Sequence, residues 1–490
     1  MGILHGVLNP HFADWPHLYF YVSAAWLAPL RLVGLVSDPA SGYLGVRVLD
    51  ALLGSLTVLL VFEFGRRAYG WLAGFFGAAA LAVAFLHVRD SHFGTLDIPL
   101  SLVSVAVMYV AYRTLQARGL RPLLINGITL GVAASLKYNG ALVFAGIAAA
   151  QTLRARVERL RWQRLLVRLA LIGILGIITL ALTSPFLVLD PGMTQHGIGY
   201  IFQHLGRATA PAIGWVQLSV ALWFGIDPVL VLLAVIGVAY AAWRRQPADW
   251  IILTFLLVYF LLIGAGRSVF LRYADPMIPL LLLLAGRALA AFVQLTAPGR
   301  TRRLALAVAF VLIAVAPLVH DVRYDLLIQQ TDTRSLAFEW LAQHVPSGGR
   351  AAVPYMAGPA HDQAMIDSGE HSHGATDPYI ASFLDSRLET RYTIRELTRD
   401  DLQLTSLDSF RNEGISYVVI GYETPGTGCG TLSPLEQALR AQGPPLASFS
   451  PTNGCPDSVF DPIDTYYVPL AGYEGWVRPG PQIRIYRLAG

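Results

Sequence analysis

The stretch Phe85-Leu-His-Val-Arg-Asp-Ser-His-Phe-Gly-Thr-Leu-Asp-Ile-Pro-Leu100 joins two long apolar runs of the sequence. This one short connection carries four ionisable side chains: Arg89, Asp90, His92 and Asp97. Ionisable groups between membrane-length helices are costly to keep there, so they indicate a functional site. The alternative is a solvated turn in which Asp97 caps the next helix, just ahead of Pro99.

The composition of the chain indicates a membrane protein. The 490 residues are 54% hydrophobic and 14% charged, whereas soluble globular chains carry about a quarter charged residues. The net charge of +4 comes from arginines that lie in short clusters between apolar runs. This distribution indicates membrane orientation, and we find no nucleic-acid-binding motif. The sequence therefore predicts a polytopic, helical membrane protein.

Ten apolar runs approach the length of about 20 residues that crosses a bilayer as a helix. They are predicted at 44–64, 70–88, 97–115, 122–139, 140–153, 168–187, 216–243, 250–266, 273–294 and 303–320. A further segment, 18–36, is rich in aromatic residues and broken by prolines, which favours a helix along the membrane interface.

Basic residues fix the predicted orientation. Every second connection is rich in arginine, as at 66–67, 113–121, 154–168, 244–245 and 300–303, and the positive-inside rule places such loops in the cytoplasm. The connections at 90–97, 187–215 and 267–272, and the chain from residue 321, then face outward. We predict an outer-face loop with interfacial helices at 1–43, a transmembrane domain at 44–320 and an extracytoplasmic α/β domain at 321–490. The expected location is the plasma (inner) membrane.

From residue 321 onward, charged residues, glycine and proline become more frequent, and helix and strand patterns alternate. This change predicts a small α/β domain. We expect helices at 333–344 and 402–413 and strands at 350–354, 415–420 and 482–488, from their apolar periodicity. The only two cysteines, Cys429 and Cys455, lie here. If this domain is exported they can form a disulfide, and the alternative is two free thiols.

Two cationic positions at predicted outward ends of spans are candidates for binding an anion. Lys137, the only lysine of the chain, is followed by Tyr138, Asn139 and the helix-breaking Gly140. Arg267, Arg272 and Tyr273 lie at a second such end, and arginines can grip a phosphate through paired hydrogen bonds. The alternative for both is ordinary anchoring to lipid headgroups.

The histidines give a weaker signal. His196 and His204 share a helical face in the loop 187–215, but no carboxylate accompanies them, so a metal site is the less favoured interpretation. We predict structural ion pairs for Arg47 with Asp50 and for Glu63 with Arg67, from their helical spacing.

With these residues in view, the chain resembles the family-39 type glycosyltransferases of the GT-C fold, the protein O-mannosyltransferase and aminoarabinose-transferase relatives. The similar stretches, in order, are 9–21, 65–70, 87–99, 137–140, 184–190, 272–276, 332–334 and 480–487. Each is loose alone, but their order and predicted side of the membrane make the resemblance fairly specific.

The resemblance implies sugar transfer from a polyprenyl-phosphate donor to an acceptor at the outer face of the membrane, with inversion. An acidic residue would act as base, and cations would hold the departing lipid phosphate. Asp97 matches the second outer-loop aspartate of the family and Asp14 is the carboxylate of the opening stretch, so both are candidate bases. The candidate substrate-binding residues are His11, Arg89, His92, Lys137, Tyr138, Asn139, Arg267, Arg272 and Tyr273. No cofactor is indicated with certainty, and a divalent metal stays open.

One departure from the family concerns the start of the chain. Family members open with a transmembrane helix and an acidic Asp-Glu pair, whereas this sequence begins inside the corresponding loop. We expect an upstream in-frame extension of about 40–70 residues that holds one further span and the acidic pair. Two other classes stay open: a transporter or flippase of a lipid-linked sugar, and a membrane-anchored binding protein. The clustering of ionisable groups at one face, without an internal repeat, favours the enzyme.

Overall fold

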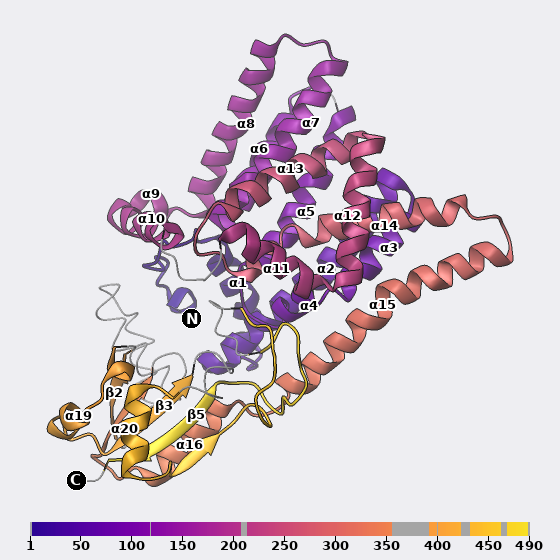
Figure 1. The fold of residues 1–490 in the computed structure, drawn as a ribbon. Helices are drawn as coiled ribbons and strands as arrows, with labels where there is room; N and C mark the ends of the chain where they lie inside the picture. Colours follow the sequence, from indigo (N-terminus) through magenta and orange to yellow (C-terminus); the bar gives the residue numbers. More distant parts are fainter. Residues whose placement is uncertain are drawn as a thin grey trace. The chain divides into compact units, whose positions relative to one another are not determined.

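The computed structural model describes residues 2–117, 119–206, 213–354, 392–398, 400–422, 432–461 and 468–488. The chain divides into two compact units, a helical unit at residues 3–321 and a C-terminal unit at residues 322–490. Both are labelled by element in Figure 1.

The helical unit contains α-helices joined by short turns (Figure 1). They are α1 (Leu18–Leu32), α2 (Pro39–Tyr69), α3 (Trp71–Ala82), α4 (Phe85–Asp90), α5 (Asp97–Arg113), α6 (Arg121–Leu136), α7 (Phe144–Val157), α8 (Trp162–Thr183), α9 (Phe186–Leu189), α10 (Pro191–Gly206), α11 (Gly214–Ile226), α12 (Pro228–Arg244), α13 (Pro247–Gly264), α14 (Ile278–Leu295) and α15 (Arg300–Ile328). The last residues of α15, from Val322, belong to the C-terminal unit. Short 3-10 helices are η1 (Gly2–His5), η2 (Thr114–Gln116), η3 (Tyr138–Val143) and η4 (Leu271–Ala274).

Among the described residues, six helices are long and apolar enough to cross a membrane, or seven if α11 and α12 form one bent span. The six begin in α2, α5, α8, α13, α14 and α15. Together with the C-terminal sheet described below, these helices confirm the predicted fold class of a multi-pass helical protein with an α/β tail.

Four of the ten predicted spans differ from the structure. The run 122–139 forms α6, an apolar helix of 16 residues that is shorter than the helices long enough to cross a membrane. The run 216–243 forms two helices at an angle of 116°, because Asp227 caps α12 through the backbone N–H of Val229 (3.0 Å) and Pro228 starts the new helix. The run 70–88 splits into α3 and α4. The run 140–153 begins as the 3-10 helix η3 before α7 continues it.

Glycines let neighbouring helices approach closely. A Cβ at Gly65 of α2 would lie 2.6 Å from the Cα of Gly74 in α3, and a Cβ at Gly286 of α14 would lie 2.3 Å from the backbone nitrogen of Gly77 in α3. Such small-residue contacts are typical of helices packed within a membrane, where close van der Waals contact drives association.

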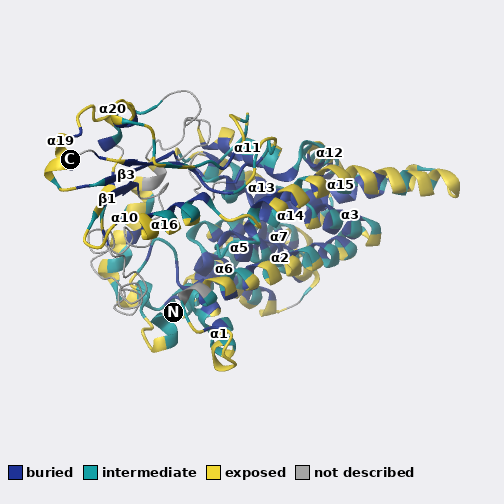
Figure 2. Cartoon of the chain, turned by 90° about the horizontal axis from the view of Figure 1, so that it is seen from below, coloured by how far each residue is buried: buried dark blue, intermediate teal, exposed yellow. Residues whose placement is uncertain are grey.

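Burial is graded across the helical unit. Figure 2 shows buried residues concentrated on α5, α13 and α14, whereas α15 is largely exposed. The exposed side chains of α8 and α15 include many large apolar ones, such as Ile177, Leu182, Phe310 and Val315. Apolar surface of this extent on long helices is what a lipid-facing surface requires.

Helix ends that the sequence placed on the cytoplasmic side come together. Tyr69 at the end of α2 donates a hydrogen bond from Oη to Oδ1 of Asp249 at the start of α13 (2.8 Å). Asp249 also forms a buried ion pair with Arg287 of α14, whose guanidinium lies 4.3 Å from the Tyr69 ring centroid. The contact between Tyr69 and Asp249 agrees with the prediction that the end of α2 and the start of α13 lie on the same side of the membrane.

Of the two predicted ion pairs in α2, one is confirmed and one is wrong. Glu63 Oε1 lies 2.8 Å from Arg67 Nε. Asp50 instead accepts hydrogen bonds from Tyr19 Oη (2.5 Å) and from the backbone N–H of Thr95 (2.7 Å). Arg47 donates from Nε to the carbonyl of His92, so its predicted partner is taken by other donors.

The C-terminal unit contains a five-stranded sheet in the order β2-β1-β3-β5-β4. Its strands are β1 (Arg350–Pro354), β2 (Thr393–Leu397), β3 (Tyr417–Tyr422), β4 (Ala447–Phe449) and β5 (Gln482–Arg487). β1 pairs in parallel with β2 and β3, and β5 pairs antiparallel with β3 and β4. Helix α16 (Thr333–His344) packs on one face, and α19 (Asp408–Asn412) and α20 (Pro434–Gln442) on the other.

Most of the predicted elements of this unit are confirmed. The helix at 333–344 and the strand at 350–354 have the predicted bounds, and the strands expected at 415–420 and 482–488 are β3 and β5. The single helix expected at 402–413 is wrong, because η5 (Asp401–Gln403) and α19 are separate. Cys455 is disulfide-bonded, while Cys429 lies outside the described residues.

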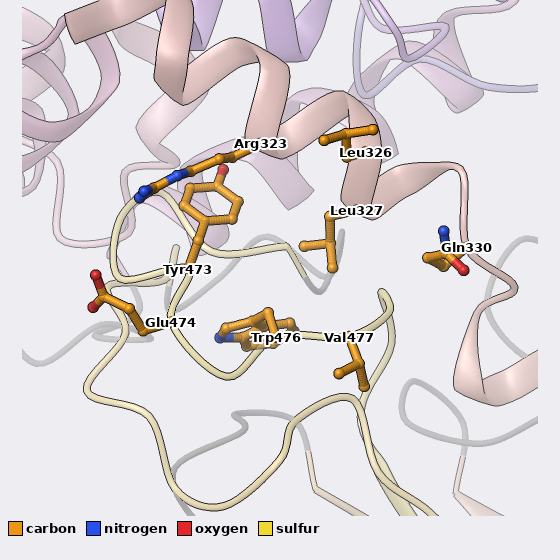
Figure 3. Close-up of a pocket in the computed structure, with 8 residues that line it drawn as sticks. All are labelled: Arg323, Leu326, Leu327, Gln330, Tyr473, Glu474, Trp476 and Val477. Carbon is orange, nitrogen blue, oxygen red and sulfur yellow. The ribbon is translucent and has the colours of Figure 1, made fainter.

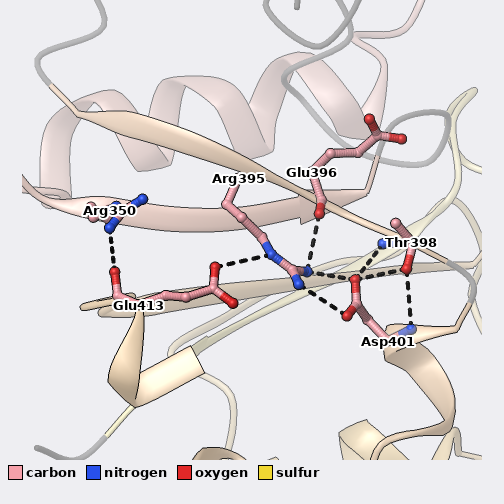
Figure 4. Close-up of polar contacts among 6 residues, drawn as sticks. All are labelled: Arg350, Arg395, Glu396, Thr398, Asp401 and Glu413. Carbon is pink, nitrogen blue, oxygen red and sulfur yellow. Dashed lines mark hydrogen bonds and ion pairs between the residues drawn. The ribbon is translucent and has the colours of Figure 1, made fainter. Parts of the chain in front are cut away.

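A charged cluster links the edge strand β2 to η5 and to the end of α19 (Figure 4). The Arg395 guanidinium contacts both carboxylate oxygens of Asp401, with Nη2–Oδ1 at 3.1 Å, and its Nε lies 3.3 Å from Glu413 Oε2. Asp401 also accepts from the backbone N–H of Thr398 (2.8 Å). Burial alone would raise the pKa of Asp401, but these donors outweigh it and lower that pKa.

Candidate functional site

The site forms where three helix ends meet within the helical unit. Asp97 is the first residue of α5, Lys137 follows the last residue of α6, and Arg272 lies in η4 ahead of α14. All three ends were predicted to face outward, so the structure brings together positions that the sequence placed on one side.

A tight turn after α6 presents Lys137. The helix ends at Leu136 because Lys137 is extended, with φ −155° and ψ 140°. The Gly140 backbone N–H then donates to the Lys137 carbonyl (2.8 Å). A Cβ on Gly140 would lie 2.1 Å from the Ala133 carbonyl oxygen, so only glycine fits here.

Asp97 is paired with both cations. Lys137 Nζ lies 2.7 Å from Asp97 Oδ1, and Arg272 Nε lies 3.3 Å from Oδ2. The Asp97 side chain is 3% exposed, whereas those of Lys137 and Arg272 are 14% and 21% exposed. The carboxylate is thus enclosed while both cations keep some access to solvent.

Aromatic rings border the two cations. Lys137 Nζ lies 4.0 Å from the centroid of the Tyr273 ring, and the Arg272 guanidinium carbon lies 4.3 Å from that of Phe270. Such contacts between a cation and a ring face are attractive and restrict where the charge can move. Of these two rings, the sequence indicated only Tyr273.

The residues that follow Lys137 connect the site to the opening segment of the chain. Tyr138 donates from Oη to the Ala13 carbonyl (3.0 Å). The Asp14 carboxylate interacts electrostatically with Tyr138. Asp14, remote in sequence, therefore lies close to the Lys137 turn, and Asn139 donates to the Oη of the buried Tyr259 (3.1 Å).

The opening segment is held against the loop that follows α8. The His17 backbone N–H donates to Ser184 Oγ (3.0 Å), and Asn9 Nδ2 donates to Asp190 Oδ2 (3.3 Å). These contacts join two of the stretches that carried the family resemblance.

Some predicted site residues are not among the ion-pair partners of Asp97. Arg89 is 1% exposed and pairs with Asp90 (Nε–Oδ1, 2.7 Å), which argues against direct contact with a substrate. His92 Nδ1 lies 2.8 Å from the Val88 carbonyl oxygen, within its own turn. His11 and Arg267 are exposed, and neither ion pair of Asp97 involves them.

A buried carboxyl that sequence reasoning did not single out lies beside Arg272. Asp275 ends η4 and is fully buried. Its carboxyl interacts electrostatically with Asp90, Asp97 and Arg89. Its signal was present in the sequence, as the acidic residue of the Arg272-Tyr-Ala-Asp-Pro276 stretch.

Among the described residues, no group of three or more His, Cys, Asp or Glu side chains is placed to hold a metal ion. The side chain of His204 lies outside the described residues, so the less favoured interpretation of a metal at His196 and His204 is not tested.

The fold and the site define a multi-pass membrane protein with a compact cluster of charges where three helix ends meet. Residues 25–188 match the family described as dolichyl-phosphate-mannose-protein mannosyltransferase. This match covers α2 to α8 and includes Asp97 and Lys137. Over these residues the chain is similar to that family, in agreement with the predicted resemblance to membrane glycosyltransferases.

Solved structures with a similar chain course include three glycosyltransferases. ArnT from Cupriavidus metallidurans is 17% identical with a TM-score of 0.49, over 97% of this chain and 88% of that one. The oligosaccharyltransferase AglB from Archaeoglobus fulgidus is 13% identical with a TM-score of 0.48, over 83% of this chain and 61% of that one. The mycobacterial arabinofuranosyltransferase AftD is 16% identical with a TM-score of 0.42, over 95% and 36%. This chain thus spans less than two thirds of the length of AglB. A search of curated proteins found no match to this chain.

Proposed function

We propose that this chain transfers a sugar from a polyprenyl-phosphate donor to an acceptor at the outer face of the membrane, with inversion at the sugar carbon. The proposal rests above all on the ion pairs of Asp97 with Lys137 and Arg272. The family description supports it, because a dolichyl-phosphate sugar is a polyprenyl-phosphate donor. The acceptor is a protein, a lipid or a glycan, and the membrane is the plasma (inner) membrane.

Lys137 and Arg272 would bind the phosphate of the donor. Two cations and one carboxylate leave a formal charge of plus one at the cluster, which attracts an anion. A phosphate gains negative charge as its bond to the sugar breaks, so fixed cations stabilise the transition state more than the ground state. The rings of Tyr273 and Phe270 keep both cations in place before the donor arrives.

Asp97 would hold the two cations in position. Each of its oxygens is in contact with one of them, and the carboxylate is almost fully enclosed. This geometry favours a positioning role over the predicted role as base. Separating either pair would leave a buried charge without a partner. The free-energy cost of that separation holds the cluster together.

Asp14 would then serve as the base. In the reaction, the acceptor oxygen or nitrogen forms a bond to the sugar carbon while the bond from that carbon to the phosphate oxygen breaks. The acceptor proton moves to the Asp14 carboxylate, and the lipid phosphate leaves with the bonding electron pair. A single displacement of this kind inverts the configuration. Tyr138, whose hydroxyl is held by Ala13, would fix the Asp14 segment beside the cations.

A radiolabelled polyprenyl-phosphate sugar tests this function. Full-length protein in lipid nanodiscs should convert the donor to free lipid phosphate and a labelled acceptor, and Lys137→Ala should abolish this conversion. A flippase would move the donor across a vesicle membrane without cleaving it, and a binding protein would retain it unchanged. Activity in the presence and absence of a chelator tests the proposed option of a divalent metal.

A further inference from the structure

The C-terminal unit holds a cavity of about 380 Å³ between the end of α15 and the loop 472–477 (Figure 3). This volume lies in the range of small-molecule sites, about 300–1,000 Å³. Its lining includes Leu327, Tyr473 and Trp476, with Arg323, Gln330 and Glu474 around them. Figure 3 shows Trp476 opposite Leu327 and the Arg323 side chain alongside the Tyr473 ring.

The aromatic side chains are fixed by the protein and offer ring faces to the cavity. Trp476 donates from Nε1 to Ser458 Oγ (2.9 Å), and its ring centroid lies 5.3 Å from that of Phe460. Tyr473 donates from Oη to the Pro469 carbonyl (2.8 Å). Because both polar groups are satisfied within the unit, these rings differ from interfacial anchors, whose polar ends face lipid headgroups.

The loop that carries Tyr473 and Trp476 is already ordered by its own backbone contacts. Gly472 and Gly475 have φ of +79° and +83°, which glycine adopts without strain. The Asn453 backbone N–H donates to the Gly475 carbonyl (2.7 Å), and that of Val459 donates to the Ala471 carbonyl (3.0 Å). Little ordering is then needed when a ligand enters, which favours binding.

The polar residues supply both donors and acceptors. Arg323 offers only N–H donors, Glu474 only acceptors when ionised, and Gln330 offers both. A sugar ring combines an apolar face of C–H groups with hydroxyls that donate and accept. We propose that this cavity binds a single sugar ring, with one face on Trp476 and its hydroxyls directed to Arg323, Gln330 and Glu474.

This proposal concerns the unit from residue 322 to residue 490 and does not depend on the transferase site. It adds a carbohydrate-binding site to the proposed function. Its failure would leave the transferase proposal standing, and a loss of transferase activity would leave the sugar site standing.

Saturation-transfer NMR on the full-length protein in detergent tests the site. The probes are methyl α-D-mannopyranoside and methyl β-D-glucopyranoside, with glycerol 1-phosphate as a lipid-headgroup probe. We expect transfer to the ring protons of at least one glycoside with the wild-type protein and with Lys137→Ala. Trp476→Ala should lose this signal, whereas Trp476→Phe should keep part of it.

Two further variants keep the test decisive if Trp476→Ala disturbs the loop. Glu474→Ala and Gln330→Ala change exposed residues, and each should weaken glycoside binding by up to about tenfold. Trp340→Ala removes the other tryptophan of the unit, which stacks on His344 outside the cavity, and should leave binding unchanged. A glycoside signal that persists in Trp476→Ala and Glu474→Ala overturns the proposal. So does a wild-type protein that responds to neither glycoside, or only to glycerol 1-phosphate.

Discussion

Lys137 Nζ lies 2.7 Å from Asp97 Oδ1, although the two residues are 40 positions apart in the chain. The contact joins the only lysine of the sequence to the last acidic residue of the stretch 85–100. It changes the interpretation of both residues, because Asp97 becomes the partner of a cation and Lys137 is held in place before any donor binds.

Substitution of the two candidate aspartates separates their roles. Asp14→Asn should lower turnover by about 10²–10⁴-fold with donor affinity unchanged, because it removes the base. Asp97→Asn should tighten binding of the bare polyprenyl phosphate by about tenfold, because the resident negative charge no longer competes for the cations. Steady-state kinetics and donor binding on the same preparations measure both effects. If Asp97→Asn loses turnover as severely as Asp14→Asn with donor affinity unchanged, Asp97 is the base instead.

The turn that presents Lys137 depends on Gly140. Gly140→Ala would place a Cβ 2.1 Å from the Ala133 carbonyl oxygen, so the backbone must shift, at a cost of roughly 1–3 kcal/mol. Both the thermal stability of the full-length protein and its donor affinity should fall. Gly173→Ala in α8 is the matched control, because a Cβ there meets nothing within 4 Å. Equal behaviour of the two variants would show that the turn is not constrained.

The buried carboxylate of Glu436 should make the C-terminal unit sensitive to acid. Glu436 accepts hydrogen bonds from Tyr422 and Tyr486 and pairs with Arg484 (2.8 Å). Burial alone would raise the pKa of Glu436, but these donors outweigh it and lower that pKa below 4.5. The stability that they contribute is therefore complete above about pH 4.5 and is lost as the pH falls through the lowered value.

The free energy of unfolding of the C-terminal unit, measured above and below about pH 4.5, tests the role of the ionised Glu436 carboxylate. Glu436→Gln keeps the shape but removes the charge, so it should be less stable than wild type near neutral pH by roughly 3 kcal/mol. The difference should shrink as the pH falls below 4.5. A difference that stays constant with pH would argue that the ionised carboxylate contributes nothing.

The orientation in the membrane can be tested by labelling single introduced cysteines. Leu160→Cys lies in the arginine-rich connection after α7, and Asp400→Cys lies in the C-terminal unit. In intact cells, a membrane-impermeant maleimide should label Cys at 400 and not at 160, because arginine-rich loops stay in the cytoplasm. Labelling of both positions from the same side would contradict the predicted topology.

The sequence predicted the helices and the C-terminal elements well where periodicity was strong, as at 333–344 and 350–354. It failed where a polar residue interrupts an apolar run. Asp227 and Pro228 split one predicted span, although a cap followed by proline is a recognisable start of a helix. Lys137 and Arg272, the two cations that pair with Asp97, could be named from the sequence as candidates, because charged residues at helix ends stand out in an apolar sequence.

What could not be predicted were contacts between distant segments. Nothing in the sequence states that Asp97 meets both cations, that Asp14 approaches Tyr138, or that Arg89 is buried against Asp90. Tyr259 lies within an apolar run, and its hydrogen bond with Asn139 depends on how α13 packs. Such contacts are set by tertiary packing, which no local pattern encodes.

The central claim is that Lys137 and Arg272 bind the donor phosphate, and the most direct measurement is the affinity of the purified protein for polyprenyl phosphate. Lys137→Ala and Arg272→Ala each remove a charge-assisted contact worth about 1.5–3 kcal/mol, so each should weaken binding by about 10- to 150-fold. Arg300→Ala, an exposed arginine at the start of α15, is the control and should bind like wild type. Folded Lys137→Ala and Arg272→Ala proteins that bind polyprenyl phosphate with wild-type affinity would contradict the account.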